Sequence, residues 1–281
     1  MRALSVNVAA AREDEAAVAL WDHGTCGLEV RPAAAGRVEL LAYFEHEPDQ
    51  ERLESVLPDA AIAGVPVPEV DWLARFRENF RPFRVGRFLI RPRWDKAAAT
   101  PELLVVDPGR AFGTGTHETT RLCLEALEQL ASSRVLGRTL DLGSGTGILA
   151  VAAERLGARP LVASDIDPEA TDASRLHAEL NSARLHVVRA DGGTAFRPGS
   201  FDLVLANLMA LLLIDRVEEI RALLAPGGAL VLSGLLLDDV APVTQAYAAC
   251  GVPREFRSGE WAALVFDAPE AFASPAAGAP R

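Results

Sequence analysis

A glycine-rich turn at residues 141–147, Asp-Leu-Gly-Ser-Gly-Thr-Gly, is the segment whose residue types most directly suggest chemistry. Gly143 and Gly145 permit a tight turn and let a ligand lie against the backbone, where a Cβ atom would collide with it. A dinucleotide-binding loop needs another glycine three positions after Gly145, and Ile148 stands there. The acidic Asp141 suits the ammonium and sulfonium charges of S-adenosylmethionine, so we expect that cofactor; a NAD-dependent dehydrogenase is the alternative.

Aspartates end two of the apolar runs that follow this turn. Asp165 ends the next predicted strand, where a carboxylate can accept hydrogen bonds from both ribose hydroxyls of a nucleoside. Asp167, directly before Pro168, is expected to cap a helix. Asp191 ends the third strand and either accepts a hydrogen bond from the adenine amino group, which we favour, or forms a turn before two glycines.

Asn207 ends the fourth strand, and from there its side chain would face the transferred methyl group. Its amide oxygen can accept a hydrogen bond from an incoming amine and so orient the nitrogen lone pair. Enzymes that methylate base amino groups commonly carry Pro-Pro-aromatic after this residue, whereas Leu-Met-Ala follows here. The sequence therefore favours an aliphatic amine of a protein. It offers no evident general base, so we expect a lysine proton to leave through water, aided by an apolar pocket.

Composition limits the partners and the metal chemistry of the chain. The net charge of −11 disfavours a nucleic-acid backbone as the main partner. An acidic surface would attract a basic protein, or would simply keep the chain soluble. The three cysteines lack metal-ligand spacing and are expected to be buried thiols, and the five histidines form no cluster, so no metal is expected.

The location of the protein is expected to be cytoplasmic. The N-terminal residues 1–7 alternate like a strand and do not have the pattern of a signal peptide. No apolar run reaches the roughly 18 residues that a membrane-spanning helix requires.

Short apolar strands alternate with helical stretches from residue 139 onward. This alternation predicts a doubly wound, Rossmann-like α/β sheet of seven mostly parallel strands, and a closing hairpin supplies the last two of them. The expected strands are Thr139–Leu142, Leu161–Asp165, Leu185–Arg189, Phe201–Ala206, Ala229–Ser233, Glu255–Arg257 and Trp261–Asp267, and the expected helices include Ile148–Leu156, Pro168–Asn181 and Leu213–Leu224.

The N-terminal part has a different pattern. Residues 1–69 follow the order β-α-β-β-α-β, which is the ferredoxin-like arrangement, and they form a small α+β domain in our prediction. Residues 70–100 are expected to be a linker with a helix at Asp71–Phe83 and a strand at Val85–Trp94. Residues 101–268 are expected to be the catalytic domain, and 269–281 an Ala- and Pro-rich disordered tail.

One further segment allows a family resemblance to be stated. Residues 112–120 read Phe-Gly-Thr-Gly-Thr-His-Glu-Thr-Thr, and this string resembles a signature of the ribosomal protein L11 methyltransferases. The turn at 141–147, the Asp-Ile-Asp-Pro run at 165–168 and Ala206-Asn207 match in the same order. The resemblance covers roughly residues 70–267, whereas the N-terminal part matches in size and expected topology more than in motif.

The resemblance implies a substrate-recognition role for residues 1–69 and methyl transfer from S-adenosylmethionine to lysine ε-amines and the α-amine of ribosomal protein L11. It places Thr120, Gly143, Asp165 and Asn207 at the cofactor, and the loop from Phe112 to Thr116 would close over the site. Three alternatives stay open: lysines of an electron-transfer flavoprotein subunit, amines of a nucleic acid, and a non-catalytic domain that binds the cofactor or a basic protein.

Overall fold

The computed structural model describes residues 2–25, 27–34, 36–44, 46–66, 80–95, 100–107, 113 and 115–269. The chain divides into two compact units, Met1–Asp71 and Trp72–Arg281. Each unit encloses hydrophobic clusters of its own. The helix expected at Asp71–Phe83 falls for the most part on residues outside the described ones, and so does the tail beyond Pro269.

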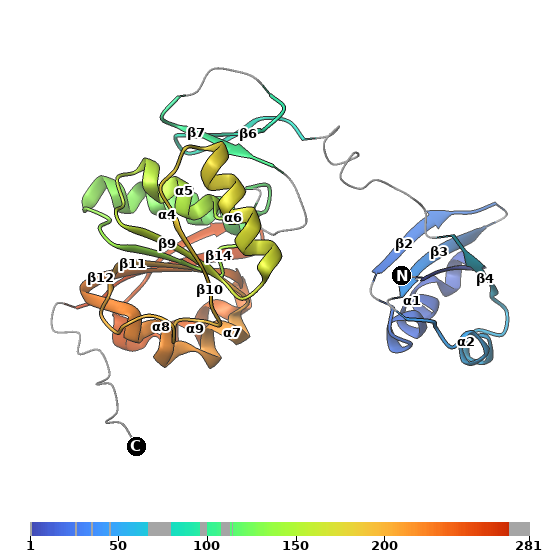
Figure 1. Ribbon diagram of the computed structural model, residues 1–281. Coiled ribbons are helices and arrows are strands. Elements are labelled where there is room, and N and C mark those ends of the chain that lie inside the picture. The colour runs from blue at the N-terminus through green and yellow to red at the C-terminus, as the bar shows by residue number, and fades with distance from the viewer. Residues whose placement is uncertain are drawn as a thin grey trace. The chain divides into compact units, whose positions relative to one another are not determined.

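The N-terminal unit is a four-stranded antiparallel sheet with two helices (Figure 1). The strand order is β2-β3-β1-β4, which confirms the ferredoxin-like prediction. Leu4, Val6 and Val8 alternate along β1 and are buried against Leu20 of α1 and Leu53 of α2. The elements are β1 (Arg2–Ala9), α1 (Glu13–Asp22), β2 (Gly27–Pro32), β3 (Arg37–Phe44), α2 (Gln50–Val56) and β4 (Ala61–Val65).

The second unit contains the predicted seven-stranded sheet, in the order β10-β9-β8-β11-β12-β14-β13. Only β14 runs against its neighbours; the remaining described pairs are parallel. The doubly wound fold class is therefore confirmed. The strands are β8 (Thr139–Leu142), β9 (Leu161–Asp165), β10 (His186–Arg189), β11 (Phe201–Asn207), β12 (Leu224–Leu236), β13 (Arg254–Ser258) and β14 (Trp261–Asp267).

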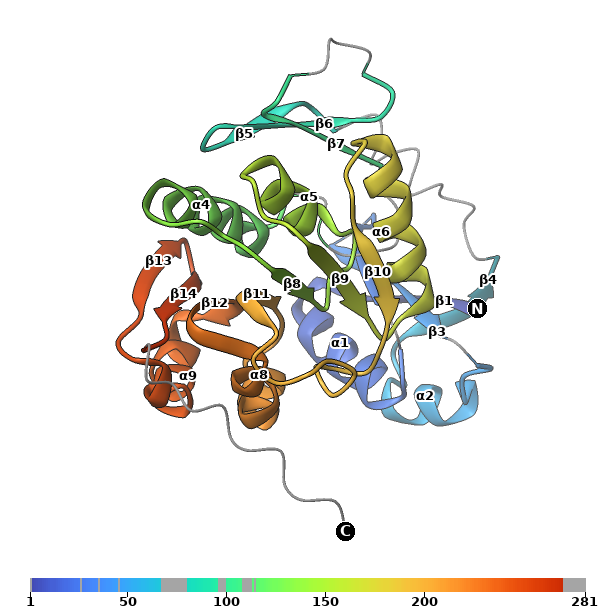
Figure 2. The same cartoon turned by 60° about the vertical axis from the view of Figure 1, so that its left-hand side comes forward.

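Helices cover both faces of this sheet. Figure 2 shows α4, α5 and α6 over one face and α8 and α9 over the other. Alternating residues of β11 separate the two cores, because Leu203 and Leu205 pack toward α4 and α5, whereas Val204 and Ala206 pack toward α7, α8 and α9. The helices are α4 (Glu118–Ser133), α5 (Ile148–Arg155), α6 (Pro168–Leu180), α7 (Ala210–Asp215), α8 (Val217–Leu223) and α9 (Val240–Ala246).

Two expected elements differ from the structure. Val85–Trp94 is not one strand but part of a hairpin of β5 (Phe83–Val85) and β6 (Phe88–Pro92), because Gly86 turns the chain with a φ of +53°. The helix expected at Leu213–Leu224 is instead α7 and α8, which are separated at Arg216. A helical period continues across both short helices, so the hydrophobic pattern could not reveal the break.

The second unit also contains a three-stranded sheet, which precedes the seven-stranded sheet in the sequence. It contains β5, β6 and β7 (Leu103–Val106), and Phe88, Ile90 and Leu104 are fully buried in the same cluster as α4 and α5. The Asn181 side chain accepts a hydrogen bond from the Val105 N–H at 2.7 Å and donates one to the Val105 carbonyl at 2.8 Å. The backbone of β7 is thereby satisfied where the sheet ends.

Other expectations can be compared with the described residues. Cys123 and Cys250 are buried free thiols, as predicted, and Cys26 lies outside the described part. Burial raises the pKa of Cys123 to about 12, which keeps its thiol unreactive. None of the described helices has the length and hydrophobicity that a membrane crossing demands.

The central position of β11 leads to a stability prediction. Replacing fully buried Leu205 with alanine leaves a cavity between the sheet and its helices, so we expect Leu205→Ala to lower the free energy of unfolding by about 2–5 kcal/mol. Urea denaturation followed by circular dichroism measures this change. The matched control Leu211→Ala removes a side chain that is 83% exposed and should stay within about 0.5 kcal/mol of wild type. Equal effects of the two variants would contradict the assignment of the core.

Candidate active site

The candidate site is a cavity of about 690 Å³ at the carboxyl ends of the parallel strands. The strand order reverses between β8 and β11, and open α/β sheets bind ligands beside such a reversal. The volume lies within the range of about 300–1,000 Å³ typical of small-molecule sites. Six of the predicted site residues line this one cavity: Thr120, Gly143, Gly145, Asp165, Asp191 and Asn207. The seventh, Phe112, lies outside the described residues.

The glycine turn follows β8 and forms the floor of the cavity. Gly143 and Gly145 have positive φ angles of +70° and +53°. A Cβ atom on Gly143 would lie 2.5 Å from Leu208 Cδ2, so a side chain there would displace the Leu208 side chain, and the positive φ would strain the backbone. The N–H groups of Gly143 and Ser144 donate to the Ser164 carbonyl at 2.8 and 3.0 Å, which joins the turn to the end of β9.

Asp141 ties this turn to the next helix. Its Oδ2 accepts a hydrogen bond from the Ala150 N–H at 3.0 Å, and the side chain is almost completely buried, so it does not line the cavity. Burial raises the pKa of Asp141 to about 8, and the nearby Asp165 carboxylate adds to the shift. From the sequence we expected the Asp141 carboxylate to interact with a cationic ligand. In the structure it is buried and bonded to the start of α5 instead.

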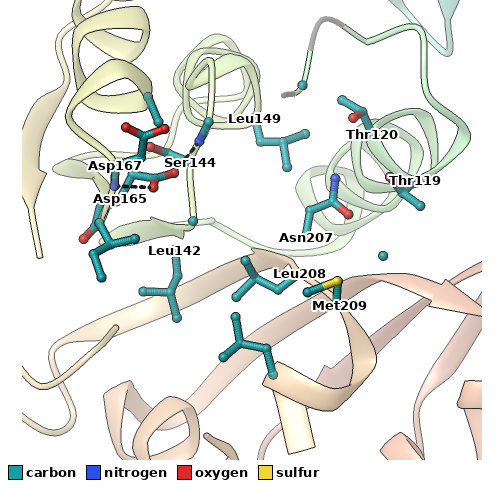
Figure 3. A pocket seen from close by; sticks show the side chains of 18 of the residues that line it. Thr119, Thr120, Leu142, Ser144, Leu149, Asp165, Asp167, Asn207, Leu208 and Met209 are labelled. Atoms are coloured by element: carbon teal, nitrogen blue, oxygen red, sulfur yellow. Dashed lines mark hydrogen bonds between the residues drawn. The ribbon is translucent and has the colours of Figure 1, made fainter. Parts of the chain in front are cut away.

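Asp165 and Asp167 form one wall of the cavity (Figure 3). The Asp165 carboxylate accepts hydrogen bonds from the Gly145 N–H at 2.9 Å and the Asp167 N–H at 3.0 Å. Asp167 caps α6, as predicted, by accepting from the Glu169 N–H at 2.9 Å. The two backbone donors fix the Asp165 carboxylate, and its further lone pairs can accept from a ligand.

Polar atoms of the cavity wall lack partners within the part of the chain that the structure describes. They are Thr120 Oγ1, Ser164 Oγ and Asn207 Oδ1, and each atom is buried. Figure 3 shows Thr120 and Asn207 together, away from the wall that carries Asp165 and Asp167. An unsatisfied buried polar atom costs about 1–3 kcal/mol. None of these three atoms is open to solvent, so each would pair with a ligand only after its side chain turned toward the cavity.

Gly234, Trp261 and Arg216 are among the lining residues that were not predicted from the sequence. Gly234 follows the strand segment of β12 next to Asn207, and a Cβ atom there would lie 2.3 Å from the Leu208 carbonyl oxygen. Trp261 contributes its ring from the start of β14, and Arg216 reaches the cavity from the junction of α7 and α8. These residues lie far along the chain from the glycine turn, and no sequence motif marks them as site residues. In the structure Gly234 has a positive φ of +85°, which accompanies its close approach to the neighbouring backbone.

His117 has a structural role at the edge of the cavity. It caps α4 by accepting from the Thr119 N–H at 3.3 Å, and its ring packs edge-on against Trp261 at 4.8 Å between centroids. Apolar side chains cover much of the remaining cavity surface, namely Leu142, Ile148, Leu149, Leu208, Met209 and Leu212. The cavity thus suits a ligand with polar ends and an apolar middle.

The raised pKa of Asp141 leads to a pH prediction for stability. The folded protein holds a proton that the unfolded chain releases near pH 3.8, so the free energy of unfolding falls as the pH rises toward 8. Relative to Asp141→Asn, we expect wild type to lose about 4 kcal/mol between pH 5 and pH 9, measured by urea denaturation. A constant difference between the two proteins over this range would argue against a protonated Asp141.

Asp202→Asn is the matched control for this measurement. The Arg138 guanidinium donates to Asp202 and lowers the pKa of that carboxyl, so Asp202 stays ionised in both states above pH 5. Its contribution to stability should therefore be independent of pH from 5 to 9.

Comparisons with known proteins identify the family of this chain. Residues 2–269 match the family model described as ribosomal protein L11 methyltransferase (PrmA). The ribosomal protein L11 methyltransferase of Geobacter sulfurreducens is 41% identical over 244 residues, 80% of each chain. That of Rhizobium etli is 38% identical over 227 residues, 77% of each chain.

A solved structure gives the same result. The crystal structure of a ribosomal protein L11 methylase from Lactobacillus delbrueckii subsp. bulgaricus has a TM-score of 0.60 and 29% sequence identity to this chain. The match covers 68% of this chain and all of that one. With a family match over residues 2–269 and relatives of about 40% identity, the chain belongs to the ribosomal protein L11 methyltransferase (PrmA) family.

Proposed function

We propose that this protein transfers methyl groups from S-adenosylmethionine to lysine ε-amines and the α-amine of ribosomal protein L11. The observation that carries the proposal is the position of Asn207 at the end of β11, beside the glycine turn, in a cavity that Asp165 and Asp191 also line. An acceptor in that position suits an incoming amine. The similar proteins of Geobacter sulfurreducens and Rhizobium etli are ribosomal protein L11 methyltransferases, which supports the same substrate here.

The cavity offers suitable contacts for each part of S-adenosylmethionine. Asp165 would accept from the ribose hydroxyls, and Asp191 from the adenine amino group. The turn at Gly143 and Gly145 leaves room for the ligand against the backbone, and Thr120 Oγ1 would pair with its amino-acid end. The remaining predicted contact, Phe112, belongs to the segment that would close over the cavity. When bound, S-adenosylmethionine supplies a methyl group on a positively charged sulfur that an amine can displace.

Asn207 would act on the acceptor by orientation. Its Oδ1 accepts one N–H of the amine and directs the nitrogen lone pair toward the methyl carbon. Gly143 and Gly234 hold the adjoining Leu208 in close contact, so the position of Asn207 is fixed by the two neighbouring strand ends. Most of the rate acceleration would come from this alignment, as in other proximity effects.

The amine must be neutral before it reacts. A free lysine amine has a pKa of about 10.4, and an apolar environment lowers it because burial disfavours the charged form. Leu149, Leu208 and Met209 provide such an environment beside Asn207. We assign no general base to the site, and the proton would pass to water before the attack.

Substrate selection would belong to the N-terminal unit. All the described residues that line the cavity belong to the second unit, so the first unit is available for another task. We propose that residues 1–69 recognise ribosomal protein L11 and that the reaction takes place in the cytoplasm, where ribosomal proteins are assembled.

The roles of Asp165 and Asn207 can be separated by two variants. Asp165→Asn removes the charged acceptor of the ribose and should raise the Kd of S-adenosylhomocysteine about tenfold or more, measured by isothermal titration calorimetry. Asn207→Ala should lower kcat about a hundredfold through loss of alignment, while the Kd changes much less. Asp172→Asn, on an exposed side chain of α6, is the control and should change neither value. Unaltered binding by Asp165→Asn would contradict the cofactor assignment.

The acceptor can be identified by labelling. Incubation of the protein with labelled S-adenosylmethionine and undermethylated ribosomes should place the label on ribosomal protein L11, and mass spectrometry should assign it to lysines and the N-terminal amine. Asn207→Ala serves as the inactive control. Label found only in RNA would overturn the proposal in favour of a nucleic-acid amine methyltransferase. Label only on another protein of a cell extract, such as an electron-transfer flavoprotein subunit, would retain the reaction and replace the substrate.

A further inference from the structure

An ion pair at the cavity joins the loop after β10 to the junction of α7 and α8. Arg216 Nη2 lies 2.7 Å from Asp191 Oδ1, and both residues line the cavity. Arg216 has no part in the function proposed above. The two residues come from segments on opposite sides of the β8–β11 reversal in the strand order.

Glu219 holds the same arginine from the other side. Arg216 Nη1 lies 3.7 Å from Glu219 Oε2, and Glu219 Oε1 accepts a hydrogen bond from the Gly193 N–H. A Cβ atom on Gly192 would lie 2.3 Å from Arg216 Nη1 and 2.1 Å from Glu219 Oε1. Gly192 therefore leaves the space in which Arg216 and Glu219 reach the loop, and Gly193 supplies the N–H that Glu219 accepts.

This arrangement acts mainly on Asp191. The Asp191 side chain is 63% exposed, so the ion pair contributes little to folding stability. The ion pair engages Oδ1, and Asp191 lines the cavity, so Oδ2 is the oxygen that would accept from a donor there. Without Arg216 an exposed carboxylate could rotate among several conformations, and its contact with a ligand would be weaker.

We infer that Arg216 is a positioning residue that holds Asp191 so that the site prefers a 6-aminopurine to a 6-oxopurine nucleoside. The inference rests on the proposed function, in which Asp191 accepts from the adenine amino group. A 6-oxo group presents an acceptor in place of that donor, and its oxygen would face the carboxylate with no hydrogen bond between them. The ion pair that orients Asp191 therefore determines the preference for the 6-aminopurine over the 6-oxopurine.

The test compares the binding of two nucleosides to the full chain. Isothermal titration calorimetry gives the Kd of S-adenosylhomocysteine and of S-inosylhomocysteine, its 6-oxo counterpart. We expect wild type to prefer the amino form about tenfold or more, Arg216→Gln to reduce the preference to about threefold or less, and Arg216→Lys to restore part of it. Arg175→Gln is the matched control, because Arg175 forms an ion pair of the same 2.7 Å length with Asp172, away from the cavity.

A second variant distinguishes a specific change of preference from a general loss of structure. Asp191→Asn keeps Arg216 and should also remove most of the preference, while S-adenosylhomocysteine still binds. An unchanged preference in Arg216→Gln, or no preference in wild type, would overturn the inference and leave the methyl-transfer proposal intact. Failure of wild type to bind either nucleoside would instead reject the proposed function itself.

Discussion

The close approach between the turn after β8 and the loop after β11 is the constraint on which the site depends. Leu208 fills the space beside Gly143, and its backbone presses against Gly234 at the end of β12. A side chain at Gly234 would collide with the backbone of Leu208, and one at Gly143 would displace the Leu208 side chain. The carboxyl ends of β8, β11 and β12 are thus held in one compact group, and the cavity opens beside it.

This packing explains why polar groups from distant segments can act on one ligand. Thr120 begins a helix that covers one face of the sheet, Asn207 ends a central strand, and Asp165 ends its neighbour but one. Each is attached to an element with a buried side, so its position is set by the core and not by its own contacts with the ligand. A site of this kind is largely preformed, and a ligand binding to it loses less conformational entropy than a flexible site would require.

Much of this arrangement could be predicted from the sequence, because the informative residues adjoin regular elements. The strand ends at Asp165, Asp191 and Asn207 and the glycine turn are local signals, and they indicated the fold and five residues of one cavity; the sixth, Thr120, was implied by the family resemblance. Trp261 and Arg216 were missed because they reach the cavity through tertiary packing, which leaves no pattern in a short window of sequence. The break at Arg216 was missed for a related reason: the apolar period continues through it.

The two walls of the cavity differ in how many contacts a substitution would disturb. Asp165 and the glycine turn are bonded to each other and to β9, so a substitution there disturbs several contacts at once. Met209 and Leu211, which follow Asn207, are 74% and 83% exposed and support no part of the core. Substitutions at these two exposed positions would therefore disturb fewer contacts than substitutions at Asp165 or in the glycine turn.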